Sequence, residues 1–421
     1  MRPFMPVVLF LALGCSLAAQ PNPGDFIVGD YGRTTSHGGV FAIDPVTGKR
    51  TTLVNTLMPG YYTNWITMDL DNRNMMAVSA GNIDIVFRVS PTGGVTTVAA
   101  PFGYLDLMGI TLDEDGTYLV TPDTGAGDPI LRVTGSSVST VTTTSHNILN
   151  GICVDPATGH YVMPVWGTGL VINVDRNTLA VTTIGKMPAP VTRITSVDYH
   201  PWSGDFLVTS FGGYNDPMNV YKMDRGGSTT IFIALQTLQK NFFDHAVKVD
   251  DQTGDIYVAG SGGIGVYPPG GGSTPTKTFG PLGFSWTSLE VYGSRNVVGQ
   301  GSGRAGTAYT FDLSFPLQKS APYIAALSLS GLQPGILLPN GRTVHLIPDP
   351  LAVLMITHGD IQGITSGFVG TLNSQGNARA IVNIPPGFPP GIRLYIGVLV
   401  MPGAGISSWE VGNPCAFTTK K

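Results

Sequence analysis

The chain has 421 residues, and only 12% of them are charged, about half of the usual share. Its net charge is −4 and the sequence contains no stripe of basic residues, which argues against a nucleic-acid partner. An apolar content of 42% alongside 56 glycines and 32 prolines excludes a disordered chain and favours short strands separated by turns. The length allows two or three domains.

The first 19 residues, MRPFMPVVLFLALGCSLAA, have the layout of a signal peptide. Arg2 supplies the positive start, residues 7–13 the apolar run, and residues 16–19 a small-residue cleavage site. The run is too short to span a bilayer and no later segment is long enough, so we expect an exported protein without a transmembrane segment, in the periplasm or at the cell surface. Gly14-Cys15 is an alternative lipoprotein signal, although Ala12 stands where that signal prefers leucine.

A repeated unit follows. Apolar alternation ends in an aspartate five times, at intervals of 42 to 52 residues, and each time a Gly-containing turn and a second apolar strand come next. The aspartates are Asp69, Asp113, Asp155, Asp198 and Asp250. Since aspartate side chains cap turns, we interpret this recurrence as a turn requirement, in preference to a metal site in every repeat.

A third and a fourth strand complete each repeat, as in VFRVS (86–90) followed by PTGGVTTVAA (91–100). Four antiparallel strands in about 40 to 45 residues are typical of a β-propeller blade. The second strand recurs seven times, the last time at 296–299, and the first strand recurs six times. The fold class is therefore all-β, with seven blades favoured and six blades with an irregular closure as the alternative.

These repeats resemble the NHL, YVTN and virginiamycin-lyase-like propellers, in which an apolar strand ending in Asp leads through a Gly turn into a Tyr-Val strand. HYVMP (160–164) and DIYVA (255–259) carry that pattern here. The resemblance spans about residues 24–315. It implies a propeller that serves as a lactonase, a lyase or a binding scaffold.

From about Ser320 the predicted strands no longer follow the sequence pattern of the repeated unit. This tail resembles the C-terminal β-sandwich of secreted proteins of planctomycetes and similar bacteria, which implies a packing or surface-association module. The matching positions include Gly335, Gly341-Arg342, Asp349-Pro350-Leu351, Phe368 to Leu372, Gly376-Asn377-Ala378, Ile384-Pro385 and Asn413-Pro414. The expected organisation is a signal peptide at 1–19, a propeller at 20–316 and a β-sandwich at 317–421.

The loops around the channel of the propeller vary in sequence between repeats. A function specific to this protein is expected at these variable positions. The predicted ligand-binding residues are Asn64, Asn150, Arg193, His245, Asp30, Tyr31, Asp123, Trp166 and Phe211. Among them His245 and Arg193 are the candidates for acid–base chemistry.

No cofactor is predicted. Ca²⁺ or Mg²⁺ prefers about six oxygen ligands, and the only candidate ligands in these loops are Asn64, Asn150, Asp30 and Asp123. The favoured function is an exported binding or scaffold protein of the bacterial envelope that recognises a small molecule, a glycan or a protein on its channel face. The alternative is a metal-assisted lyase or lactone hydrolase of the propeller type.

Overall fold

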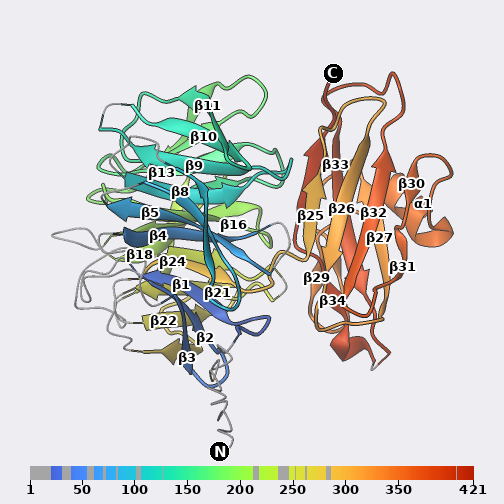
Figure 1. Cartoon of the computed structure of the whole chain (residues 1–421), viewed down its shortest axis with the longest axis horizontal. Coiled ribbons are helices and arrows are strands. Elements are labelled where there is room, and N and C mark those ends of the chain that lie inside the picture. The colour runs from blue at the N-terminus through green and yellow to red at the C-terminus, as the bar shows by residue number, and fades with distance from the viewer. Residues whose placement is uncertain are drawn as a thin grey trace, which may run out of the picture.

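The computed structural model describes residues 20–30, 39–54, 61–69, 73–81, 84–100, 106–125, 127–211, 218–235, 246–251, 253–260, 263–280, 286–403 and 405–421. The strands form two bodies that stand side by side (Figure 1). The larger body contains the strands up to about residue 291, and the smaller body contains those that follow.

The larger body is built from six units of four antiparallel strands, which we call blades 1 to 6. A single backbone pairing, Ala80 with Asp106, joins the sheets of blades 2 and 3. Blade 1 holds β1 (Phe26–Asp30), β2 (Gly39–Ile43), β3 (Arg50–Val54) and β24 (Trp286–Val291); blade 2 holds β4 (Tyr61–Met68), β5 (Met75–Gly81), β6 (Val86–Val89) and β7 (Val95–Ala99); blade 3 holds β8 (Asp106–Leu112), β9 (Tyr118–Asp123), β10 (Pro129–Thr134) and β11 (Ser137–Thr143).

Blades 4 to 6 repeat the same order, each with its first strand innermost. Blade 4 holds β12 (Cys153–Val154), β13 (Tyr161–Val165), β14 (Leu170–Val174) and β15 (Val181–Lys186); blade 5 holds β16 (Ile194–His200), β17 (Asp205–Ser210), β18 (Asn219–Met223) and β19 (Thr229–Ala234); blade 6 holds β20 (Ala246–Val249), β21 (Ile256–Gly260), β22 (Gly263–Tyr267) and β23 (Lys277–Phe279).

The ring closes through blade 1, where β24, from the end of the propeller, pairs with β1 from its beginning. The packing between neighbouring blades completes this closure, because Phe26 of β1 lies 4.7 Å from the ring of Tyr257 and 5.5 Å from that of Phe279, both in blade 6. Each edge-on aromatic pair stabilises the contact by about 0.5–1.5 kcal/mol.

The described strands thus give six blades, and the favoured count of seven is corrected to the six-blade alternative. The apparent seventh copy at 296–299 was misleading because a short apolar run such as Val297-Val298 fits a buried strand of any β-sheet. In the structure it is β25 (Val297–Gln300), which pairs with β26 (Ala308–Ser314) outside the ring.

The repeated aspartate serves both a turn and the contact between blades. Oδ1 of Asp155 accepts the backbone N–H of Ala157 at 2.9 Å, and Oδ2 accepts the Thr158 hydroxyl at 2.6 Å. Arg225 of blade 5 donates to both carboxylate oxygens at 2.6 and 2.7 Å. Turn formation alone therefore does not account for the recurrence.

Asp198 does not belong to this series. Strand β16 continues to His200, whose carbonyl accepts the N–H of Gly204 at 2.9 Å, as the carbonyl of Asp155 accepts that of Gly159 at 2.7 Å. His200 therefore occupies the turn position of blade 5, and Asp198 lies two residues earlier, on the channel side.

The smaller body is a β-sandwich with one α-helix among its described residues. One sheet holds β25, β26, β30 (Thr365–Ser366) and β32 (Asn377–Asn383), and the other holds β27 (Pro322–Ser328), β31 (Val369–Thr371), β33 (Arg393–Val400), β34 (Glu410–Val411) and β35 (Cys415–Thr418); β28 (Ile336–Leu337) pairs with β29 (Thr343–Val344), and the helices are α1 (Pro350–His358) and the 3₁₀ turn η1 (Ile406–Ser408).

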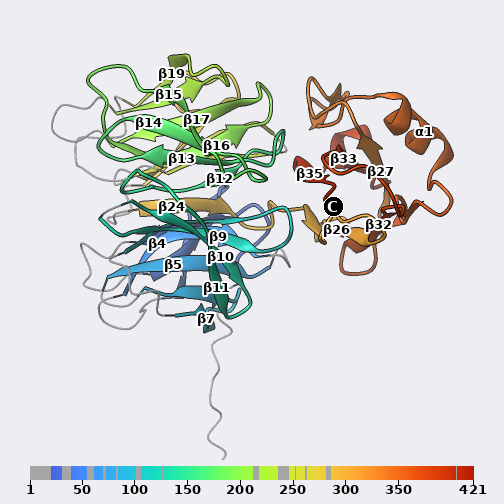
Figure 2. The same cartoon turned by 90° about the horizontal axis from the view of Figure 1, so that it is seen from above.

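Asp349 begins α1 by accepting the N–H of Ala352 at 2.9 Å, and Pro350 suits the first helical position because it has no N–H to satisfy. Both views place α1 on the side of the sandwich away from the propeller (Figure 2). With nine residues in α1, no helix among the described residues is long and apolar enough to cross a membrane.

Strands β25 and β26, which the sequence assigned to the last blade, are sandwich strands. Tyr309, Phe311 and Leu313 of β26 are buried in the sandwich core, and β26 pairs along its whole length with β32. Arg295 still contacts Thr67 of the propeller, whereas the carbonyl of Asn296 accepts the N–H of Ser314. We therefore propose a boundary between residues 295 and 296, in place of the expected 316.

A chain of residues 20–316 is expected to be less soluble than one of residues 20–295, because it carries β25 and the apolar face of β26 without the sheet that buries them. Soluble yield and thermal melts of the two chains measure the difference. Cooperative melting of residues 20–316, together with aggregation of residues 20–295, would contradict the revised boundary.

Candidate functional site

The structure describes seven of the nine predicted binding residues. Tyr31 and His245 lie outside the described residues. His245 was the main candidate for acid–base chemistry. The remaining seven divide into one cluster and four separate positions.

Arg193, Trp166 and Phe211 form the cluster. The Trp166 and Phe211 rings meet edge-on with centroids 4.8 Å apart, and the Arg193 guanidinium lies 5.9 and 6.0 Å from their centroids. The N–H of Phe211 also donates to the Arg193 carbonyl at 2.9 Å, which ties the two segments together. Cation–π attraction of this kind contributes about 0.5–1 kcal/mol per exposed contact, so the cluster is held in a defined arrangement.

Strand β16 places this cluster on the face of the propeller opposite the sandwich. Arg193 precedes the seven-residue strand, and Trp202 follows it and lies 5.0 Å, ring to ring, from His345 of the sandwich. A strand of that length spans roughly 23 Å. We call the end of the propeller that carries Arg193, Trp166 and Phe211 the open face.

Asn64 and Asn150 are both buried, with 7% of each exposed. The Asn64 amide donates to the Leu107 carbonyl at 2.8 Å, and the Asn150 backbone N–H donates to the Pro164 carbonyl at 3.1 Å. Asn64 thereby links blade 2 to blade 3, which is a structural role.

The two aspartates are strand-end residues. Asp30 ends β1 and is 1% exposed, while Asp123 ends β9 and accepts the N–H of Gly125 at 2.9 Å in the following turn. Within the described part of the chain, no three His, Cys, Asp or Glu side chains converge as metal ligands.

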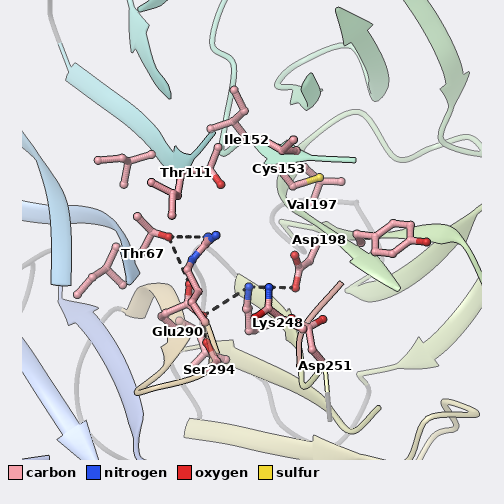
Figure 3. A pocket seen from close by; sticks show the side chains of 18 of the residues that line it. Thr67, Thr111, Ile152, Cys153, Val197, Asp198, Lys248, Asp251, Glu290 and Ser294 are labelled. Atoms are coloured by element: carbon pink, nitrogen blue, oxygen red, sulfur yellow. Dashed lines mark hydrogen bonds and ion pairs between the residues drawn. The ribbon is translucent and has the colours of Figure 1, made fainter. Parts of the chain in front are cut away.

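A second polar site, which the sequence did not predict, lies in the central channel (Figure 3). Each innermost strand contributes one residue to this site, and that residue has the same register position in every blade. It lies opposite the second residue of the apolar run in the adjacent strand of its blade. These six residues, which we call the channel ring, are Thr67, Thr111, Cys153, Asp198, Lys248 and Glu290.

One half of the channel ring is charged and the other half is neutral. The Lys248 ammonium lies 3.6 Å from Asp198 and 3.5 Å from Glu290, so it bridges blades 5, 6 and 1. Arg295 donates to the Thr67 hydroxyl at 3.0 Å on the other side of Glu290. Burial disfavours the ammonium, but attraction to Asp198 and Glu290 outweighs it, and the pKa of Lys248 is raised.

The cavity enclosed by this ring measures about 130 Å³ and is also lined by Asp251 and by Asn413 and Pro414 of the sandwich. Burial raises the pKa of Asp251 to about 7. Ligand pockets usually measure about 300–1,000 Å³, whereas this volume corresponds to about four water molecules at ~30 Å³ each. The channel is therefore suited to solvent and to charge pairing between blades.

One sequence pattern could have identified this site, but aligning the repeats on their aspartates obscured it. HPWSG (200–204) matches DPATG (155–159) position by position, which places His200 opposite Asp155 and moves Asp198 into register with Lys248. Aligning the repeats on their turns would have placed the charged residues in one layer. The link between Lys248 and Glu290 still depended on the closure of blade 1.

No family model matches the chain, and no curated protein matches it. The solved structures that resemble it include a Bacteroides caccae protein described as of unknown function, with 15% identity over 64% of this chain and 98% of that one and a TM-score of 0.48. A chain of a nidogen/laminin complex shows 12% identity over the same shares, with a TM-score of 0.49. The propeller assignment rests on the strand pairing of the chain itself.

Proposed function

We propose that the protein is an exported β-propeller binding module that holds an acidic saccharide on its open face. The observation that carries the proposal is the cluster of Arg193 with Trp166 and Phe211. Its residues come from three segments of blades 4 and 5: Trp166 and Phe211 directly follow β13 and β17, and Arg193 directly precedes β16. Export is supported by the signal-like residues 1–19.

The chemistry of the cluster favours a ring-shaped ligand with a carboxylate. Trp166 is half-buried and can present an apolar ring surface to a sugar, while a guanidinium forms paired hydrogen bonds with a carboxylate. A uronic acid offers both groups in one residue. The sandwich lies at the opposite face and leaves this end of the propeller to the ligand.

Replacing Arg193 by glutamine is expected to weaken binding of a uronic-acid oligosaccharide about ten- to hundredfold, since a hydrogen bond to a charged group is lost. Trp166→Ala should weaken binding of the acidic oligosaccharide and of its neutral counterpart alike. Isothermal titration calorimetry measures both effects, and thermal melts with ligand provide a second readout.

Lys186→Gln serves as the matched control, because Lys186 is an exposed cation on the same part of the propeller. Unchanged affinity in Arg193→Gln, or an equal loss in Lys186→Gln, would contradict recognition by the cluster.

A further inference from the structure

Asn64 and Asn150 occupy the same position in two blades, since each stands five residues before the repeated aspartate. The strand pairing agrees with this. In blade 2 the pairing of β4 with β5 skips Asn64, and in blade 4 Asn150 directly follows the pair of Leu149 with Val165. An extra residue in a strand forms a β-bulge, which redirects its side chain and is frequent next to functional sites.

The two asparagines differ in the hydrogen bonds of their side chains. The Asn64 amide donates to the Leu107 carbonyl of the next blade at 2.8 Å. In blade 5 the position of Leu107 is taken by Ile194, but within the described part of the chain no hydrogen bond engages the Asn150 side chain. Asn150 is nevertheless only 7% exposed. Leaving a buried amide without a partner costs free energy, so an unpaired one calls for a functional reason.

The unpaired amide belongs to a residue beside the cluster on the open face. The N–H of Trp166 donates to the Ile148 carbonyl at 3.0 Å, and Asn150 lies two residues further along the same segment. In blade 5, Arg193 directly precedes Ile194, the residue that corresponds to the partner of Asn64. The register therefore places Asn150 between the aromatic ring and the guanidinium group of the cluster.

We propose that Asn150 determines which acidic sugar the open face accepts, by pairing with two adjacent hydroxyls of the sugar residue whose carboxylate Arg193 holds. The inference rests on the proposed function of the open face. An amide presents an acceptor oxygen beside an NH₂ donor, and adjacent hydroxyls of a sugar ring can donate to the one and accept from the other. A site built to hydrogen-bond a hydroxyl rejects analogues that lack it. The ligand is therefore an acidic sugar with two free, adjacent hydroxyls.

The test uses the full mature chain with trigalacturonic acid as the probe, and its methyl ester, which keeps the hydroxyls without the charge, as the neutral comparison. Asn150→Leu keeps the size of the side chain without its hydrogen bonds and should weaken binding of both ligands about tenfold in isothermal titration calorimetry. Asn150→Asp should weaken binding of trigalacturonic acid further, because the two carboxylates repel each other, and added salt should reduce this loss. The ester should tolerate Asn150→Asp, since a carboxylate accepts from both hydroxyls.

Asn64→Leu is the matched control. It removes a hydrogen bond of the ligand-free chain, so it should lower the melting temperature by about 2 °C and leave the affinity unchanged. Asn150→Leu should not lower the melting temperature of the ligand-free chain. A fall equal to that of Asn64→Leu would show that the fold itself uses the Asn150 amide and would overturn the proposal.

The binding data separate this inference from the proposed function on which it rests. If trigalacturonic acid binds and Arg193→Gln weakens it, while Asn150→Leu binds it like the native chain, the role of Asn150 is refuted and the open face remains the binding site. If the native chain binds neither ligand, both proposals are refuted.

Discussion

Replacing Lys248 by alanine is expected to lower the free energy of unfolding by about 3 kcal/mol, because it leaves Asp198 and Glu290 in the channel without their shared cation. The loss should be large because Lys248 joins three blades, including the blade that closes the ring. Chemical denaturation monitored by tryptophan fluorescence measures it.

Lys222→Ala is the matched control. Lys222 lies 3.6 Å from Asp205, the same distance that separates Lys248 from Asp198, but its side chain is 33% exposed and the pair lies outside the channel. Solvent-exposed ion pairs contribute only about 0–1 kcal/mol, so this replacement should have little effect. Similar losses in the two variants would show that burial and ring closure do not set the value of the Lys248 contacts.

Neutralising the whole group separates charge from packing. A chain with Lys248→Met, Asp198→Asn and Glu290→Gln should be more stable than Lys248→Ala alone, because Asp198 and Glu290 are then no longer carboxylates that have lost their shared cation. A triple variant less stable than the single one would contradict the electrostatic explanation.

Acidification from pH 7 to pH 5 is expected to remove about 2 kcal/mol of the stability that His345 contributes. His345 is 2% exposed at the interface of the two bodies, with Nε2 3.2 Å from the Asp251 carbonyl oxygen, and burial lowers its pKa to about 4. The imidazole of the unfolded chain takes up a proton near pH 6.5. Between pH 6.5 and 4 the unfolded state thus binds more protons, and stability falls as the pH falls.

Other buried groups oppose this trend, so the measurement is a difference between two proteins. Burial raises the pKa of Asp251 to about 7 and that of Asp113 to about 6, and both take up protons in the folded state first, which adds stability on acidification. His200, 3% exposed, has its pKa lowered by burial to about 4 and titrates in the same window as His345.

His345→Gln keeps an N–H donor for the Asp251 carbonyl and cannot take up a proton. The gap in unfolding free energy between the native chain and this variant should shrink by about 2 kcal/mol from pH 7 to pH 5. His358→Gln, at the exposed end of α1, controls for the loss of an imidazole. A gap for His345→Gln that stays constant over this range would rule out the buried neutral histidine.

The blade strands and their turns could be predicted from the sequence because their causes are local. Tyr161–Val165 is apolar throughout because both faces of a blade are covered by neighbours, and the DPATG turn at 155–159 carries its own capping carboxylate. The resemblance of the tail to a β-sandwich was also local, since alternation and turn glycines mark single strands. The sequence around Asn413 and Pro414 gave no sign that these two residues also line the propeller channel.

Three of the predicted binding residues meet in the structure, and that they bind a ligand stays a prediction. Arg193, Trp166 and Phe211 flank strands of blades 4 and 5, and their meeting follows from strand alternation and adjacency. The side-chain amide of Asn64 instead donates to a backbone carbonyl of the next blade. The neighbouring carbonyl that accepts it could not be read from either repeat alone.

By itself the sequence determined an all-β chain with a repeated four-strand unit and a differently patterned tail, since these properties depend on the order of apolar residues and turn residues. Only the tertiary structure decided the number of blades, the membership of β25 and β26, and the charged half of the channel ring. The physical reason is the distance along the chain: β24 pairs with β1 across some 260 residues, and pairing over such a separation is chosen by the packing of the whole ring rather than by local sequence.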